Sequence, residues 1–315
     1  MKILVTGGAG YIGSACVQAL CEAGHTVVVF DDLSTGQADN VSSSALLLQG
    51  DLTDSQAIFE VCAEYPFDAV MHFAAKKAVG ESETDPSLYF KTNVVGTINL
   101  LRAMDKYNIP KIIFSSTAAV YEPPADDKPF TEKTKTGPLS VYGATKLMVE
   151  DVIKTYARTG KIQEYAILRY FNVAGDAGLE YREEAAQNVF PIIARALTQG
   201  EAFNIYGTDY DTKDGTCVRD YIHLRDLVEA HTLALITQKS GTYNLGTGTG
   251  YTVRELVEAF NAELPEPLRV IEAARRPGDA PAVVADASLA AEALNWTPKH
   301  TLKEMVEDTL RVYRK

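Results

Sequence analysis

The chain has 315 residues, of which 46% are apolar, and its formal net charge is -12. This length allows one large or two modest domains with a substantial core. The acidic balance argues against nucleic acid or an anionic membrane as a partner. No stretch approaches the roughly 20 consecutive apolar residues of a membrane span. An anionic ligand would therefore need a local basic pocket.

The cysteines and the start of the chain bear on metal binding and location. Cys16, Cys21, Cys62 and Cys217 lack the spacing of a metal site, so we predict no bound metal. Cys16 and Cys21 fall on one predicted buried helix face, so we expect reduced core thiols in a cytoplasmic protein. The first predicted strand begins at residue 2, so we also expect no signal peptide.

The first thirteen residues predict the start of a dinucleotide-binding unit. Residues 2–6 form a short apolar run, and Gly7, Gly10 and Gly13 then lead into a helical pattern that ends near Gly24. Gly7 would turn the chain sharply, Gly10 would let a pyrophosphate approach the backbone, and Gly13 would let the helix pack on the strand. The helix N-terminus would offer free N–H groups to the phosphates. The alternative is a glycine-rich turn that binds nothing.

Asp31 follows the second predicted strand, residues 26–30. It lies about 20 residues past the glycine loop, where dinucleotide-binding folds place the acid that bonds the adenine ribose hydroxyls. Its carboxylate would repel a 2′-phosphate, so we predict NAD and not NADP. The alternative is an exposed strand-end aspartate with no ligand.

Strand–helix alternation continues to about residue 170 and predicts the fold class. Continuous apolar strands alternating with helices indicate an α/β fold with a parallel sheet covered on both faces. We therefore expect a Rossmann-type, doubly wound parallel sheet. The further strands are predicted at 45–49, 68–73, 111–116 and 165–170, with helices from about 54, from 85 to about 106 and from 140 to about 158.

Past residue 175 the elements shorten and the loops carry Gly, Asn and Asp. We expect an NAD-binding domain over residues 1–175 and a smaller α+β substrate domain at the C-terminus, residues 176–315. The segment 218–235 is predicted as a strand and a helix that return to the first domain. A capping box at Thr252 predicts the start of another helix.

Tyr142 and Lys146 form a Y-x-x-x-K pair on a predicted helix, where positions i and i+4 share a face. A free phenol has a pKa of about 10, too high for a base at neutral pH. A nearby ammonium favours the phenolate, so the pair suits proton abstraction. By itself, such a pair is more often an ordinary surface feature.

A hydroxyl cluster ends the predicted strand at residues 111–116. Ser115, Ser116 and Thr117 stand at its carboxyl end, the edge where open α/β sheets place their sites. Thr117 could bond the substrate oxygen that Tyr142 deprotonates. A helix cap or turn is the alternative role.

Together these features resemble the extended short-chain dehydrogenase/reductase family, and more narrowly its UDP-galactose (UDP-glucose) 4-epimerases. The resemblance covers nearly the whole chain. Thr117 stands where many members have serine, which keeps the hydroxyl. The segments that carry the narrower resemblance are 72–82, 170–172, 215–223 and 275–281.

The resemblance implies a catalytic set of Tyr142, Lys146 and Thr117, with NAD as cofactor and a UDP-sugar as substrate. Two arginines would supply the basic pocket for the pyrophosphate, although each could instead form a surface ion pair. The implied cofactor contacts are Gly7, Gly10, Tyr11, Ile12, Gly13, Asp31, Asp32, Thr35, Gly36, Asp51, Leu52, Phe73, Ala74, Ala75, Lys77, Tyr142, Lys146 and Phe171. The implied substrate contacts are Thr117, Tyr142, Asn172, Asn188, Val189, Asn204, Tyr206, Arg219, Arg276, Asp279 and Val283.

The expected activity is reversible C4 epimerisation of UDP-hexoses through a transient 4-keto sugar, with tightly bound NAD. The family also suggests a homodimer. The alternatives are a nucleotide-sugar 4,6-dehydratase or decarboxylase, and a non-catalytic NAD-binding sensor. Dehydratases in this family place an acid pair after the threonine of the fifth strand and the decarboxylases keep the glutamate, whereas this chain has Ala118 and Ala119.

Val283 occupies the position of a gate residue beside the 2′ substituent of the hexose. Family members with tyrosine there look limited to UDP-glucose and UDP-galactose. Because valine lacks the ring, we expect the N-acetylated pair to be accepted as well. The alternative is a core strand residue, since the setting alternates apolar positions.

Overall fold

The computed structural model describes residues 1–123, 128–182, 188–276 and 279–314. The chain folds into two compact units. The first comprises residues 1–122, 135–169 and 228–243, and the second comprises 123–134, 170–227 and 244–315.

The first unit is built on a seven-stranded sheet with the order β10-β6-β5-β4-β1-β2-β3. Strand β1 pairs in parallel with both β2 and β4, and β2 with β3 and β4 with β5 are parallel too. The predicted α/β fold with a parallel sheet is confirmed. The strands are β1 (Lys2–Thr6), β2 (Thr26–Asp31), β3 (Leu46–Gln49), β4 (Ala69–His72), β5 (Lys111–Thr117), β6 (Glu164–Tyr170) and β10 (Gly241–Leu245).

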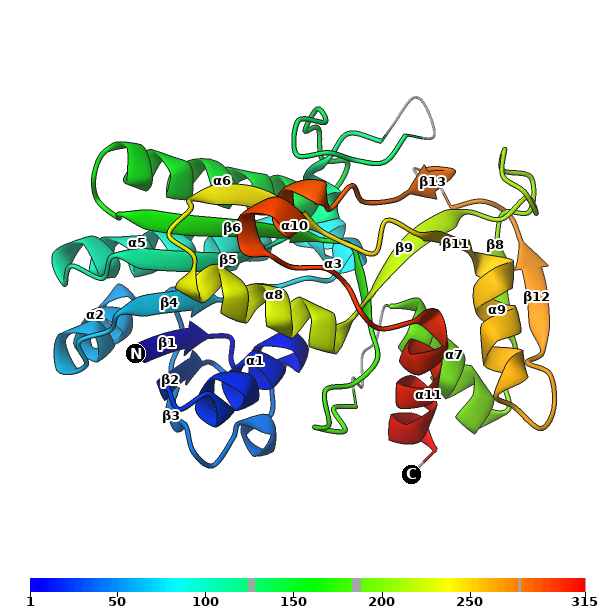
Figure 1. The fold of residues 1–315 in the computed structure, drawn as a ribbon, viewed down its shortest axis with the longest axis horizontal. Helices are drawn as coiled ribbons and strands as arrows, with labels where there is room; N and C mark the ends of the chain where they lie inside the picture. The colour runs from blue at the N-terminus through cyan, green and yellow to red at the C-terminus, as the bar shows by residue number, and fades with distance from the viewer. Residues whose placement is uncertain (124–127, 183–187, 277–278, 315) are drawn as a thin grey trace. The chain divides into compact units, whose positions relative to one another are not determined.

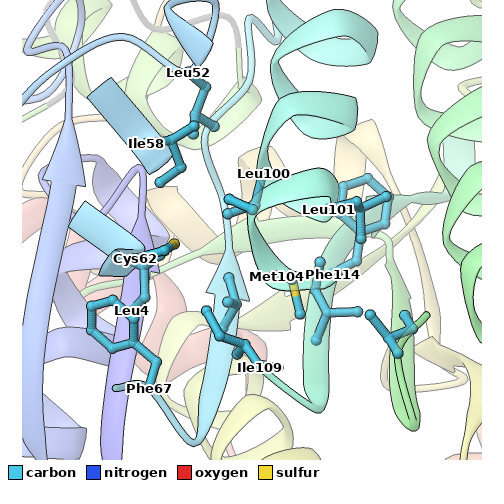
Figure 2. Close-up of a cluster of buried hydrophobic side chains, with 14 of the residues drawn as sticks. Leu4, Leu52, Ile58, Cys62, Phe67, Leu100, Leu101, Met104, Ile109 and Phe114 are labelled. Carbon is cyan, nitrogen blue, oxygen red and sulfur yellow. The ribbon is translucent and has the colours of Figure 1, made fainter. Parts of the chain in front are cut away.

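Helices cover both faces of this sheet (Figure 1). On one face, Ile58 and Cys62 of α2 meet Leu100 and Met104 of α5 in a buried apolar cluster (Figure 2). Helix α1 packs on β1 and β2 from the other face. The helices are α1 (Tyr11–Glu22), α2 (Ser55–Glu64), α5 (Gly96–Lys106), α6 (Val141–Arg158) and α8 (Leu224–Ile236), with short 3-10 turns η1 (Ala38–Asn40) and η3 (Ala118–Val120).

The helix predicted over 85–106 is interrupted. Helix α3 (Val79–Thr84) precedes α4 (Pro86–Tyr89), and a π-helical segment, η2 (Phe90–Val95), separates α4 from α5. The Asn93 side chain in η2 accepts a hydrogen bond from the Lys76 backbone N–H at 2.8 Å. It donates to the Lys76 carbonyl and the Thr145 hydroxyl, each at 3.0 Å. The π-helical segment carries the amide that makes these long-range bonds, which helical periodicity cannot reveal.

The second unit contains two small sheets. Strands β11, β9 and β13 form one, with β7 also pairing with β9, and β12 pairs with β8. In its core Phe190 packs edge-on against Tyr221 and at a tilt against Phe260. The elements are β7 (Asn172–Ala174), α7 (Val189–Gln199), β8 (Phe203–Tyr206), β9 (Val218–His223), β11 (Gly250–Thr252), α9 (Val253–Ala262), β12 (Val270–Ala273), β13 (Ala282–Val283), α10 (Ser288–Leu294) and α11 (Leu302–Tyr313).

Three local expectations can be compared with the structure. The capping box at Thr252 is confirmed, because its hydroxyl and the Glu255 carboxylate exchange hydrogen bonds with the backbone at the start of α9. Cys16 is buried as predicted, but the expectation for Cys21 is wrong, because this residue lies at the end of α1 and is only partly buried. Residues 218–235 were predicted to return to the first domain, but the segment that does so is 228–243. Strand β9, at 218–223, pairs with strands of the second unit.

No helix among the described residues is long and apolar enough to cross a membrane. Within the same residues, no group of three or more His, Cys, Asp and Glu side chains is arranged to hold a metal ion.

Candidate functional site

The glycine loop between β1 and α1 is shaped by close backbone packing. Gly7 has a φ of +73°, and a Cβ added there would lie 2.4 Å from the backbone nitrogen of Ala74. A Cβ on Gly13 would lie 2.1 Å from the Gly7 carbonyl oxygen. Both positions therefore require glycine for the fold itself. Gly10 is different, because the nearest atom to an added Cβ is at 3.5 Å, an ordinary contact.

Gly10 is the N-cap of α1, and its carbonyl accepts the N–H of Ser14 at 2.9 Å. A side chain at Gly10 would meet no crowding from the protein. The bare backbone at this helix N-terminus therefore suits a close-lying phosphate group, whose charge the helix dipole favours. These residues fit the pyrophosphate of a dinucleotide.

Asp31, at the end of β2, is only 7% exposed, unlike the exposed aspartate of the alternative interpretation. Its carboxylate accepts the backbone N–H groups of Ala9 and Leu33, each at 2.9 Å. Burial raises the pKa of Asp31, and these two hydrogen bonds act in the opposite direction. A Cβ on Gly36 would lie 2.7 Å from the Ala9 side chain, so the 31–36 segment packs on the glycine loop. Asp32 and Thr35 belong to the same segment.

The stretch after β4 passes the same loop. The backbone N–H groups of Phe73 and Ala74 donate to the Thr6 carbonyl at 2.9 and 3.1 Å, which places Ala74 beside Gly7. Lys77 is exposed. The structure thus brings most of the predicted cofactor residues to the carboxyl ends of β1, β2 and β4.

Asp51 and Leu52, the two predicted cofactor residues that follow β3, have side chains engaged with other parts of the protein. Leu52 is buried, with its side chain in the cluster between the sheet and α5. The Asp51 carboxylate accepts both the N–H and the hydroxyl of Thr53, each at 2.7 Å. The Leu52 side chain therefore contributes to the core.

Lys146 lies on α6 and its side chain is buried against β5. It is 3% exposed, its Nζ donates to the Ser115 carbonyl at 2.8 Å, and the same atom lies 4.7 Å from the centre of the Phe114 ring. Burial lowers the pKa of the Lys146 ammonium to about 7, and the Glu150 carboxylate acts in the opposite direction. An amine whose pKa lies near neutrality inside a site is typical of acid–base chemistry.

Tyr142 lies in the first turn of α6 and is 8% exposed. Its backbone N–H bonds the Ser82 hydroxyl at 3.2 Å. A Cβ on Gly143 would lie 2.4 Å from the Ala119 carbonyl oxygen, so the start of α6 packs closely on η3. Thr117 immediately precedes η3, and its hydroxyl accepts the Ala119 N–H at 3.2 Å. Thr117 thus serves as a cap, and its hydroxyl proton can still donate to a ligand.

The sequence analysis did not predict the buried ion pair between Glu150 and Arg169, which lies next to Lys146 on α6. Glu150 has no exposed surface and lies one helical turn past Lys146. It accepts the Ser116 hydroxyl at 2.7 Å and the Arg169 guanidinium at 2.8 and 2.5 Å. The pair ties α6 to β5 and β6. An acid at i+4 from Lys146, on the buried face of the helix, was the available signal.

In the second unit, two arginines of the predicted substrate site are engaged in different ways. Arg219 pairs with Asp279 at 3.3 Å and donates to the carbonyls of Val218 and Ala280 at 2.8 and 2.9 Å. The Arg276 guanidinium lies 3.9 Å from the centre of the Tyr206 ring. Residues 277–278 of this motif lie outside the described residues.

The asparagines of the predicted substrate site lie in or beside three elements of the second unit, namely β7, α7 and β8. The Asn172 amide donates to the Asp220 carbonyl at 2.9 Å. Asn188 is the N-cap of α7, just before Val189, and its side chain makes no capping hydrogen bond there. Asn204 is exposed on β8. Amide groups so placed can bond a nucleotide.

Two further predicted residues belong to this unit. Phe171 is 6% exposed and packs edge-on against Phe130, with ring centres 6.2 Å apart. Val283 is partly buried in β13, and its Cα partner across the ladder is Arg219. Val283 therefore stands beside the arginine expected to bind the pyrophosphate.

Comparisons with known proteins agree with this arrangement. The pattern of the NAD dependent epimerase/dehydratase family matches residues 3–246. A UDP-glucose 4-epimerase from Corynebacterium glutamicum is 42% identical over 314 residues, which cover 98% of this chain and 94% of that protein.

Solved structures are similar over the full length. A UDP-glucose-4-epimerase from Stenotrophomonas maltophila, with bound NAD and formylated UDP-arabinopyranose, has a TM-score of 0.94 and 39% identity, and the match covers 100% of this chain and 98% of that one. The UDP-Glc/GlcNAc 4-epimerase from Campylobacter jejuni has a TM-score of 0.88 and 33% identity, with 99% of each chain covered.

Proposed function

Because the chain belongs to the NAD dependent epimerase/dehydratase family, we propose that it is an NAD-dependent UDP-glucose 4-epimerase, which interconverts UDP-glucose and UDP-galactose. The observation that carries this proposal is the anchoring of Tyr142 and Lys146 on α6 at the end of β5. In this assignment the first unit binds NAD and holds the base, and the second unit recognises UDP.

The residues of the chain divide the chemistry among them. Tyr142, as a phenolate, takes the proton from the sugar 4′-hydroxyl, and Lys146 stabilises the negative charge on the phenol oxygen. Thr117 donates a hydrogen bond to the same sugar oxygen. Bound NAD would accept the hydride from C4 of the sugar and give the hydride back to the same carbon, so no net oxidation occurs. The 4-keto sugar rotates in the pocket so that its opposite face receives the hydride. The phenol of Tyr142 then returns the proton to the 4′ oxygen.

The decisive experiment is a coupled assay for conversion of UDP-galactose to UDP-glucose with no added reductant. Turnover would support the epimerase. A 4,6-dehydratase would instead release a 4-keto-6-deoxy sugar, and a non-catalytic NAD sensor would give no product. Ala118 and Ala119 follow Thr117 at the positions where a dehydratase needs its acid pair. Tyr142 and Lys146 argue against the sensor, since a sensor does not require a catalytic pair.

The purified protein should carry NAD and not NADP. The buried Asp31 carboxylate stands at the end of β2, where a 2′-phosphate would meet a negative charge in a site of low exposure. Denaturing the protein and identifying the released nucleotide by chromatography measures this directly. Mostly NADP in the extract would overturn the assignment.

Arg219→Ala and Arg276→Ala should each weaken UDP binding by about 1.5–3 kcal/mol, because each removes a charge-assisted contact to phosphate. Isothermal titration with UDP on the NAD-loaded protein is the measurement. Arg254→Ala is the matched control, since Arg254 belongs to the same unit and pairs with Glu272 at 2.5 Å. Equal UDP affinity in all three variants would place the pyrophosphate elsewhere.

We also propose dual activity on UDP-glucose/UDP-galactose and on UDP-N-acetylglucosamine/UDP-N-acetylgalactosamine. The support is Val283, which is partly buried beside Arg219 and has no ring to fill the space of an acetamido group. The similar Campylobacter jejuni protein is named a UDP-Glc/GlcNAc 4-epimerase. The plain hexose, which lacks the acetamido group, is still accepted in the wider pocket, because the UDP group anchors both kinds of substrate.

Val283→Tyr should suppress turnover of the N-acetylated pair about tenfold or more and leave the plain pair nearly unchanged, because the new ring would occupy the acetamido space. If Val283 is instead a core residue, the extra volume should destabilise the protein by about 1–3 kcal/mol and reduce both activities alike. Paired kinetics on both substrates and a melting curve distinguish these outcomes. A wild-type protein inactive on the N-acetylated pair would end the dual-activity proposal.

The assembly and location expected from the sequence complete the proposal. Phe90 and Val95 in η2, and Met148 in the adjacent α6, are exposed apolar side chains at 37%, 46% and 45%. A second copy of the chain that covers this surface would form the homodimer suggested by the family. We expect this homodimer in the cytoplasm.

A further inference from the structure

Asp220 is a fully buried carboxylate that follows Arg219 in β9. One of its oxygens accepts the backbone N–H and the hydroxyl of Thr247, at 2.8 and 2.7 Å. The other accepts the backbone N–H groups of Gly248 and Ala285, at 3.0 and 3.1 Å. These four donors match an ionised carboxylate, which only accepts hydrogen bonds.

The four hydrogen bonds join three segments of the second unit, namely β9, the glycine-rich loop 246–250 and the residues that follow β13. The loop fits the carboxylate closely, because a Cβ on Gly246 would lie 2.6 Å from an Asp220 oxygen and 2.6 Å from the Ala285 side chain. A Cβ on Gly250 would lie 2.4 Å from the Val218 side chain. Gly246 and Gly250 therefore allow the loop to pack closely against β9.

Two predicted UDP-sugar residues lie in or beside the segments that Asp220 joins, namely Arg219 in β9 and Val283 in β13. Strand β13 has only two residues, one of them Val283, and it pairs in parallel with β9 at Val218 and Arg219. Just before β13, the Ala280 carbonyl binds the Arg219 guanidinium. The position of β13 along β9 therefore sets both the direction of the Arg219 side chain and the place of Val283.

The backbone of Asp220 adds another link, because its carbonyl accepts the Asn172 amide at 2.9 Å. We propose that Asp220 is a positioning residue for UDP-sugar binding, whose carboxylate holds β13 and the 246–250 loop against β9. In this way the carboxylate orients Arg219 and Val283, and the backbone carbonyl of the same residue holds Asn172. This inference rests on the proposed function, because those residues are its predicted UDP-sugar contacts.

The carboxylate is hard to replace for a physical reason. Asparagine has nearly the same shape, but its NH₂ group would face N–H donors where an acceptor is needed. Buried donors that lose their acceptor cost free energy, and the chain relieves this by moving apart. A strand as short as β13 has few ladder bonds of its own to resist such a movement. The effect should therefore reach Arg219, although the Asp220 carboxylate itself is fully buried among protein donors.

The test compares Asp220→Asn with Asp226→Asn in the NAD-loaded, full-length protein. Asp226 is a matched control, because it is fully buried in the same unit and accepts the backbone N–H and Nδ1 of His300 at 3.0 and 2.7 Å. For Asp220→Asn we expect the Kd for UDP and the KM for UDP-galactose to rise about tenfold or more, with kcat changed by less than about threefold. We expect a similar fall in Tm for both variants, because both carboxylates are fully buried, but for Asp226→Asn we expect an unchanged Kd for UDP.

Thr247→Val covers the case in which Asp220→Asn does not fold. This variant removes one hydroxyl donor and keeps the shape, so we expect a rise of about two- to fivefold in the Kd for UDP. An unchanged Kd in whichever of the two variants folds would overturn the proposal. An equal loss of UDP affinity in Asp226→Asn would also overturn it, because general loosening would then explain the effect.

The same titrations separate this proposal from the proposed function. A wild-type protein that binds UDP but epimerises no UDP-hexose would refute the epimerase activity, and the Kd comparison would still decide the role of Asp220. A wild-type protein that binds no UDP would overturn both.

Discussion

Tyr142→Phe should lower kcat by about 10³-fold, because it removes the phenol oxygen that takes the 4′-hydroxyl proton. The ring remains, so packing at the start of α6 should be preserved, including the backbone bond of Tyr142 to the Ser82 hydroxyl. We therefore expect UDP affinity and NAD content to match the wild type. Steady-state kinetics with UDP-galactose, UDP titration and nucleotide extraction measure the three quantities.

Tyr156→Phe is the matched control for this substitution. Tyr156 lies on the same helix, and its ring packs on the apolar cluster of the first unit. Loss of its hydroxyl should leave kcat within about twofold of the wild type, because an exchange of this size away from the site changes stability only slightly. If Tyr142→Phe kept more than a tenth of the activity, a different base would have to be sought.

Lys146→Met should lower kcat by about 10²-fold and move the pH optimum upward. The buried Nζ bonds the Ser115 carbonyl and stands one turn past Tyr142, so methionine keeps the length and the apolar contacts but removes the charge. Without an adjacent ammonium the phenolate forms less readily, and its share at neutral pH falls. A profile of kcat against pH reports both effects.

The burial of Lys146 sets the pH range in which its charge acts on the phenol. Burial lowers the pKa of its ammonium to about 7, and Glu150 opposes this shift. The charge that favours the phenolate is therefore present below neutral pH and declines above it. Lys154→Met is the control, since Lys154 pairs with the same Glu150 at 3.3 Å but is partly exposed. A wild-type pH profile in Lys146→Met would remove Lys146 from proton transfer.

Much of the fold could be predicted because its signals are local. The apolar run at 2–6, the glycine spacing after it and the acid at Asp31 each reflect interactions within about 30 residues, and β1, α1 and β2 lie where these patterns predict. The pair Tyr142 and Lys146 is local in the same way, because one helical turn separates them. The predictions for the more distant site residues came from the family resemblance.

The tertiary structure alone decided the contacts between segments that are far apart in the chain. Helical periodicity cannot show the π-helical segment that brings Asn93 to Thr145, 52 residues away. The pairing of Glu150 with Arg169 depends on where β6 lies beside β5.

The sequence by itself determined the parallel sheet, the glycine loop and the spacing of Tyr142 and Lys146 on one helix, because periodicity and short spacings encode them directly. Which carboxylates are buried, and what they hold, depended on strand pairing. Asp220 is an acid inside a recognised motif, but its four donors come from Thr247, Gly248 and Ala285. Long-range hydrogen bonds leave no periodic trace in a sequence, so only the folded chain shows which segments they join.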